Sequence, residues 1–244
     1  EVERVFETLG ERNDLRRSEI ARLEYTYIDV LASHSRYGIP NLSKELAESP
    51  QLFTHMAALC FRRQDGGTDP AELGVPEDQE HRRILAQKAF TALEHASVIP
   101  GTRSDGRIDP TVLGKWVDDV RAQARTLGRL EIVDQRIGHI LSSCGQGKDG
   151  IWPAEEIRGV VERVASKDLA IGLELGMRNG HSAEFHAVDA NADRKRAADF
   201  RADGEAIMNR WPLVARMLFS LASSYEAEAE WHESDDRVRR RLRD

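Results

Sequence analysis

Apolar residues recur every three or four positions along almost the whole 244-residue chain, and this period most restricts the fold. Such spacing gathers apolar side chains on one face of an α-helix. Two segments show this spacing clearly. After Ser18 the apolar positions are Ile20, Leu23, Tyr27, Val30 and Leu31. After Pro110 they are Leu113, Trp116, Val117, Val120, Ala124 and Leu127. No stretch alternates apolar and polar residues as a half-buried strand does. The pattern therefore predicts an all-α fold.

Capping residues predict where several of these helices begin and end. Asp109 followed by Pro110 is typical of an N-cap and a first helical position, where the missing proline N–H has no cost. Gly128 is expected to end the same helix, because glycine readily adopts the left-handed conformation beyond a last turn. Further helices are expected over 78–97 and 130–141 and after Pro153.

Two segments of the chain resemble each other at an offset of 44 positions. Each opens with an Asp-Gly turn, and the matched apolar pairs are Leu113 and Ile157, Trp116 and Val160, Val117 and Val161, and Val120 and Val164. A period of this size is typical of stacked helical hairpins. We therefore expect a multi-helix bundle or a short HEAT-like helical-hairpin array. The domains expected are a helical body over 1–180 and a C-terminal helical pair over 181–244 that packs on it, or one single domain over 1–244.

Charge and composition argue against several classes of protein. The formal net charge is −7, whereas a duplex-binding domain usually presents a basic face, so the overall balance does not favour a nucleic-acid partner. No run approaches the 18 apolar residues of a membrane span, and the first residues do not resemble a signal peptide. Cys60 and Cys144 lack the spacing of a zinc site and fit buried, reduced thiols. These features predict a cytoplasmic protein without a membrane partner, and a start other than Met is typical of a piece of a longer chain.

The C-terminal region carries the clearest stripe in the chain, with the spacing 4, 3, 4, 3, 4. Its members are Ile207, Trp211, Val214, Leu218, Leu221 and Tyr225. Pro212 predicts a break or a new helix start after Trp211. Heptad spacing of this kind favours docking of a partner helix, from another domain of a longer parent chain or from a second copy. The alternative is that the stripe packs on the chain's own body.

One polar segment has the residue types of a metal or acid–base site. These residues are His181, His186, Asp189 and Asp193, and imidazole with carboxylate suits zinc or manganese. Their spacing matches no known mechanism, and the chain has no HExxH, GxSxG or phosphate-binding glycine loop. The two Asp-Gly turns lack the further carboxylates that a calcium loop needs. The sequence therefore predicts neither a catalytic residue nor a cofactor.

The chain ends in an acidic stretch followed by a basic one. The basic residues are Arg237, Arg239, Arg240, Arg241 and Arg243. They could contact a phosphate backbone. The alternative is a solvated helix end, in which acid-then-base order suits the helix macrodipole.

Three segments read GRLEIVDQRIGHIL, DGIWPAEEIRGVVERVAS and WPLVARMLFSLASSYEAEAE. They resemble helical regions of large, multidomain, uncharacterised bacterial proteins, over about Ile20 to Arg237, and the loop 180–191 departs from that pattern. The resemblance implies a bacterial helical module within a larger protein and supplies no catalytic residue. The leading hypothesis is a non-enzymatic interaction, scaffold or regulatory domain. The alternatives are an enzyme or metal-binding domain with a site near 181–193, and a nucleic-acid-binding regulator that uses the C-terminal arginines.

Overall fold

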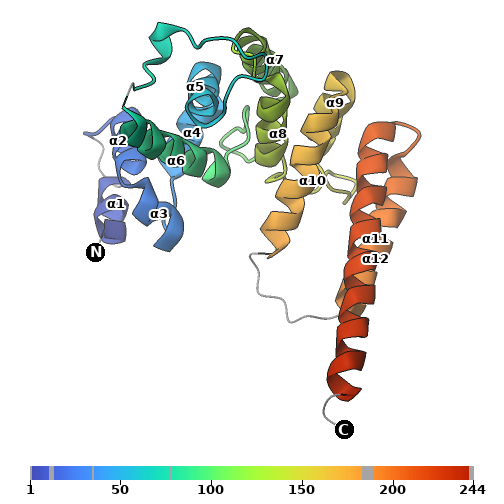
Figure 1. The fold of residues 1–244 in the computed structure, drawn as a ribbon. Coiled ribbons are helices and arrows are strands. Elements are labelled where there is room, and N and C mark those ends of the chain that lie inside the picture. Colours follow the sequence, from blue (N-terminus) through green and yellow to red (C-terminus); the bar gives the residue numbers. More distant parts are fainter. Residues whose placement is uncertain (1, 11–13, 35, 77, 183–189, 242–244) are drawn as a thin grey trace.

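The computed structural model describes residues 2–10, 14–34, 36–76, 78–182 and 190–241, and all of its regular structure there is helical (Figure 1). An isolated antiparallel bridge joins Thr102 to Ile108 within one loop. The predicted all-α class is therefore confirmed. The α-helices are α1 (Val2–Gly10), α2 (Arg17–Thr26), α3 (Ile28–His34), α4 (Pro40–Glu48), α5 (Pro50–Cys60), α6 (Gln79–His95), α7 (Pro110–Thr126), α8 (Leu130–Leu141), α9 (Glu155–Val164), α10 (Lys167–Ser182), α11 (Ala190–Ile207) and α12 (Pro212–Arg241), and a 3-10 turn, η1, spans Ala71–Leu73.

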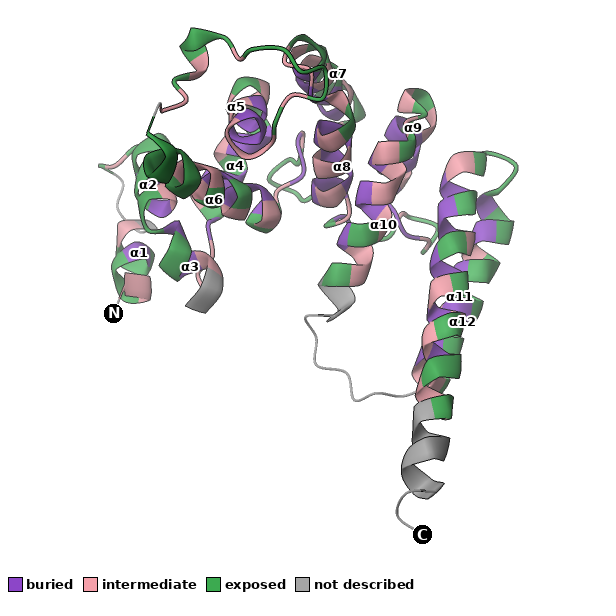
Figure 2. Cartoon of the chain, in the orientation of Figure 1, coloured by how far each residue is buried: buried purple, intermediate pink, exposed green. Residues whose placement is uncertain are grey.

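The helices lie roughly in chain order from one end of the molecule to the other (Figure 1). Helices α1 to α6 gather at the N-terminal end, α7 and α8 lie in the middle, and the α11–α12 hairpin forms the opposite end. The closest packing joins α5 to α6, α8 to α10, and α11 to α12. Most helices carry both buried and exposed residues along their length (Figure 2). The core is thus a continuous apolar layer between successive helices.

The predicted helix boundaries are confirmed where capping residues defined them. The Asp109 carboxylate accepts hydrogen bonds from the backbone N–H of Thr111 and Val112 at the start of α7. Gly128, just beyond α7, has φ +61°, in the left-handed region. Helix α12 begins at Pro212, as the proline predicted. Local capping chemistry therefore determines these ends before any packing is considered.

Helices α8 and α10 cross at unusually close range because glycines line the contact. A Cβ atom built on Gly172 of α10 would lie 2.7 Å from the Cα and C atoms of Gln135 in α8. One built on Gly138 of α8 would lie 2.6 Å from the backbone N of Leu173. Real side-chain carbons keep about 3.5–4.0 Å from such atoms. The two backbones therefore touch in a way that side chains at these positions would prevent.

Two fully buried arginines hold loops onto the helical layer. Arg129 donates to the carbonyl of Phe61 at 2.6 Å, next to the end of α5, and pairs with Asp69 at 2.7 Å. Arg158 of α9 pairs with Asp149 at 2.6 Å and donates to the carbonyl of Pro153 at 2.6 Å. A buried guanidinium is stable only when such partners satisfy its donors. Each arginine therefore holds in place the loop that supplies its hydrogen-bond acceptors.

The α11–α12 hairpin is attached to the rest of the chain mainly through α9 and α10. The Glu162 carboxylate of α9 accepts from the backbone N–H groups of Leu213 and Val214, at 2.7 and 3.0 Å, and so caps α12. The guanidinium of Arg158 lies 5.0 Å from the centre of the Trp211 ring. Among the described residues, no helix is both long enough and apolar enough to cross a membrane.

Candidate interaction surfaces

The C-terminal stripe predicted as a partner-helix face lies inside the chain. Its members Ile207, Val214, Leu218, Leu221 and Tyr225 are buried, and Trp211 is half-buried. The Tyr225 ring stacks on Phe200 of α11, with ring centres 5.8 Å apart. The sequence could not show which helix covers the stripe, because heptad spacing records an apolar face and not its partner. In this conformation the face is unavailable to a second protein.

The four residues of the metal hypothesis are only partly described. His181 belongs to the last turn of α10, and His186 and Asp189 lie outside the described residues. Asp193 is buried in α11, where it pairs with Arg196 at 3.4 Å and lies 3.8 Å from Nε2 of His232 on α12. Within the described part of the chain, no group of three or more His, Cys, Asp or Glu side chains is placed to hold a metal. Asp193 therefore contributes to the contact between α11 and α12.

The arginine tail is described only in its backbone. Arg237, Arg239, Arg240 and Arg241 belong to the end of α12, and Arg243 lies outside the described residues. Phosphate binding by these residues therefore stays a prediction.

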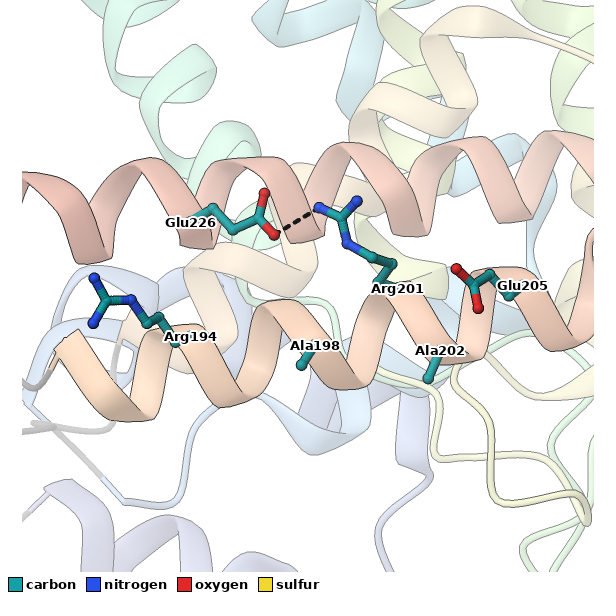
Figure 3. A pocket seen from close by; sticks show the side chains of 6 residues that line it. All are labelled: Arg194, Ala198, Arg201, Ala202, Glu205 and Glu226. Carbon is teal, nitrogen blue, oxygen red and sulfur yellow. Dashed lines mark hydrogen bonds and ion pairs between the residues drawn. The ribbon is translucent and has the colours of Figure 1, made fainter.

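The hairpin has a shallow external groove of about 450 Å³, shown in Figure 3. Ala198 and Ala202 of α11 form its floor, between Arg194 at one end and Glu205 at the other. Arg201 crosses to α12 and pairs with Glu226 at 2.6 Å, and Arg194 pairs with Glu233. Because both arginines are already paired, the groove offers little net charge to a ligand.

A polar cluster lies where α6 meets α8. Arg136 of α8 pairs with Glu94 of α6, and its guanidinium lies over the rings of Phe61 and Phe90, at 5.5 and 5.3 Å. Nε2 of His139 lies 3.1 Å from the backbone carbonyl O of Glu94. The buried side-chain Nε of Arg136 has no hydrogen-bond partner. The cluster therefore joins the N-terminal helices to α8 by a few polar contacts between aromatic rings.

Burial controls the protonation of the titratable groups in this cluster and beside it, which include Cys60 and His95. It raises the pKa of the Cys60 thiol to about 12, despite the nearby Arg136 charge, so the thiol is protonated at neutral pH and is a poor nucleophile. Burial also lowers the pKa of His139, and the Arg136 charge lowers it further. The pKa of His95 is lowered by burial and by its proximity to His139. Both imidazoles are therefore held in the neutral form, as suits structural groups.

The surface that sequence reasoning missed lies on α2 and α3. Sequence spacing placed Leu23, Tyr27 and Val30 on the buried face, but their side chains are 39%, 50% and 45% exposed. Ile20 and Leu31 are buried as expected. Leu23 lies in α2, Val30 lies in α3, and Tyr27 is the residue between the two helices, where its ring also meets the edge of Phe6 at 6.1 Å between ring centres. The three exposed side chains therefore follow one another across the α2–α3 junction, and we call them the α2–α3 stripe.

A buried carboxylate explains why the helix is rotated away from its predicted orientation. Glu24 is fully buried and accepts from the backbone N–H of Leu42 at 2.6 Å and from Nδ2 of Asn41 at 2.7 Å. The hydroxyl of Tyr37 also donates to it, at 3.0 Å. Glu24 thereby caps the start of α4, whose own N-cap residue, Ile39, supplies no side-chain bond. α2 thus buries Ile20 and Glu24, α3 buries Ile28 and Leu31, and the α2–α3 stripe is left exposed.

Comparisons with protein-family models, with curated proteins and with solved structures find no match to this chain.

Proposed function

We propose that this chain is a non-enzymatic helical interaction and scaffold domain, part of a larger bacterial protein as the sequence resemblance implies, and that it associates with a second copy of itself. The observation that carries the proposal is the α2–α3 stripe. Leu23, Tyr27 and Val30 expose apolar surface in a row that a second helix can cover.

The charges beside the stripe favour a second copy as the occupant. Arg22 of α2 and Asp29 of α3 are both exposed, are the sequence neighbours of Leu23 and Val30, and have no ion pair within the described residues. Antiparallel pairing of two stripes about a two-fold axis places Leu23 of one copy near Val30 of the other and Tyr27 near Tyr27. The same operation brings Arg22 of each copy toward Asp29 of its partner. Charge and apolar surface are therefore complementary under a single symmetry operation.

The stripe is small, so the association is expected to be weak. Covering a half-exposed apolar side chain contributes about 1 kcal/mol, since full burial is worth about 1.5–3 kcal/mol. Six such side chains give about 6 kcal/mol, and two Arg22–Asp29 pairs add about 1 kcal/mol each. Against the lower end of the cost of association, about 4 kcal/mol, a net of about 4 kcal/mol remains. This corresponds to a dissociation constant of about 1 mM. Weak pairing of this kind becomes effective when several copies are held near one another.

Sedimentation equilibrium over a concentration series tests the proposal. We expect the apparent mass of the full chain to rise with concentration and Tyr27→Lys to abolish the rise, because the substitution places a charge at the centre of the stripe. Trp231→Lys is the matched control, since Trp231 is 62% exposed on α12 at the other end of the molecule.

A charge exchange identifies the geometry of the pair. Arg22→Asp should weaken association, and the double variant Arg22→Asp with Asp29→Arg should restore it. A chain that stays monomeric at millimolar concentration, or a Tyr27→Lys variant that associates like the unaltered chain, would refute the proposal.

A further inference from the structure

A cleft of about 310 Å³ lies where the turn between α9 and α10 faces the first half of α12. Its apolar lining includes Val161 and Met217, which are buried, and Ile171 and Leu213, which are half-buried. This volume is at the lower end of the range of small-molecule sites. A narrow apolar chain fits such a space better than a large ring system.

Ala165 adds a methyl group to the wall of the cleft at an energetic cost. It follows the last residue of α9 with φ +50°, and among the described residues it is the one non-glycine residue in the left-handed region. An L-residue there costs about 1–2 kcal/mol, and glycine is the residue that usually occupies this position. Ala165 is nevertheless one of the residues that line the cleft.

Two cations line the same cleft without a counter-ion. Lys167 and Arg216 are both exposed, and neither forms an ion pair with any residue that the structure describes. One carboxylate, Glu174, also lines the cleft, where it accepts from Oγ of Ser220 at 2.9 Å and forms no ion pair with either cation. Glu162 caps α12. The lining therefore carries two positive charges and one negative charge, and this net positive charge is available for an anion that enters the cleft.

We propose that this cleft binds an unbranched, medium-chain carboxylate. Its chain lies against Val161, Ile171 and Met217, and its carboxylate faces Lys167 and Arg216. The ligand would touch α9 and α10 on one side and α12 on the other, so it would link the hairpin to the rest of the chain. This inference does not depend on the self-association proposed above, because the two surfaces lie on different helices.

Calorimetric titration of the full chain with octanoate tests the proposal, with octanol and octylamine as matched ligands that keep the chain and change the charge. We expect octanoate to bind with a dissociation constant of about 1 mM, as its few non-hydrogen atoms allow. Octanol should bind more weakly, and octylamine more weakly still. Equal binding of all three ligands would show a nonspecific apolar contact and would overturn the proposal, as would no heat of binding from octanoate.

Variants locate the site on the protein. The double variant Lys167→Gln with Arg216→Gln should weaken octanoate binding about tenfold, as expected for two partly solvated charge contacts. Arg210→Gln is the control, because Arg210 is exposed, lies near the start of α12 and does not line the cleft. Ala170→Leu should fill the cleft and remove binding while far-UV circular dichroism stays unchanged. Unaltered affinity in the double variant would place the ligand elsewhere and refute the inference.

Discussion

Replacement of Gly172 by alanine tests the close crossing of α8 and α10. The new Cβ atom would lie 2.7 Å from the Cα and C atoms of Gln135 and closer still to its carbonyl O, so the two helices must separate by more than about 1 Å to reach ordinary contact. Backbone atoms cannot rotate away, which places the cost at the upper end of overpacking, about 3 kcal/mol. Alanine has a higher helix propensity than glycine, which offsets about 1 kcal/mol of this cost. The expected net loss of unfolding free energy is therefore about 2 kcal/mol.

Gly159→Ala is the matched control for this substitution. Gly159 lies inside α9, is exposed, and a Cβ atom there would meet nothing within 4 Å. The control should therefore gain about 0.5–1 kcal/mol. Urea unfolding followed by circular dichroism measures both variants, and the melting temperature of Gly172→Ala should fall by about 4–8 °C. If both substitutions changed stability in the same direction and by the same amount, the backbone contact would not be the cause.

Three further substitutions test local features of the fold. Ala165→Gly should raise the unfolding free energy by about 1 kcal/mol in urea melts, since it relieves left-handed backbone, and a loss would contradict this. Asp149→Ala should lower it by about 3 kcal/mol because Arg158 stays buried without its carboxylate, and a change near zero in the same melts would refute that account. Folding lowers the pKa of His139, so the unfolded chain binds more protons and stability should fall as the pH drops below 6.5. His139→Gln should show a smaller fall in melting temperature over that range, and an unchanged pH profile would exclude His139 as its source.

The sequence predicts a helix well where capping and packing agree. Helix α7 begins at Pro110 after the Asp109 cap, and its predicted apolar positions Leu113, Trp116 and Val117 are all buried. Each of these features depends on residues within the helix itself. Local spacing and local hydrogen bonds were therefore sufficient to define both the ends of α7 and the face that it buries.

Helix α2 shows where local information fails. The apolar spacing does not include Glu24, and a lone carboxylate is costly to bury. Its partners come from Tyr37, Asn41 and Leu42, which reach it only when α4 packs on α2. The α2–α3 stripe becomes exposed as a consequence of this contact. A surface created by tertiary hydrogen bonds in this way leaves no signal in the spacing of apolar residues.

The C-terminal stripe shows a related limit of sequence spacing. Its spacing was correct, and α12 does begin at Pro212, but α11 and α9 lie against it. Apolar spacing reports that a face will be covered and does not distinguish a neighbour in the same chain from a second molecule. Of the four residues of the metal hypothesis, Asp193 is the one whose side chain is described, and its carboxylate pairs with Arg196.

The near-sequential order of the helices bears on how the molecule opens. Because the α11–α12 hairpin contacts the remaining helices mainly through α9 and α10 and has its own buried rings, it can detach as one cooperative unit while the α8–α10 crossing stays closed. Amide protons of α12 would then exchange with solvent at a lower opening free energy than those of α8. The molecule would lose its structure in stages, from the C-terminal end inward.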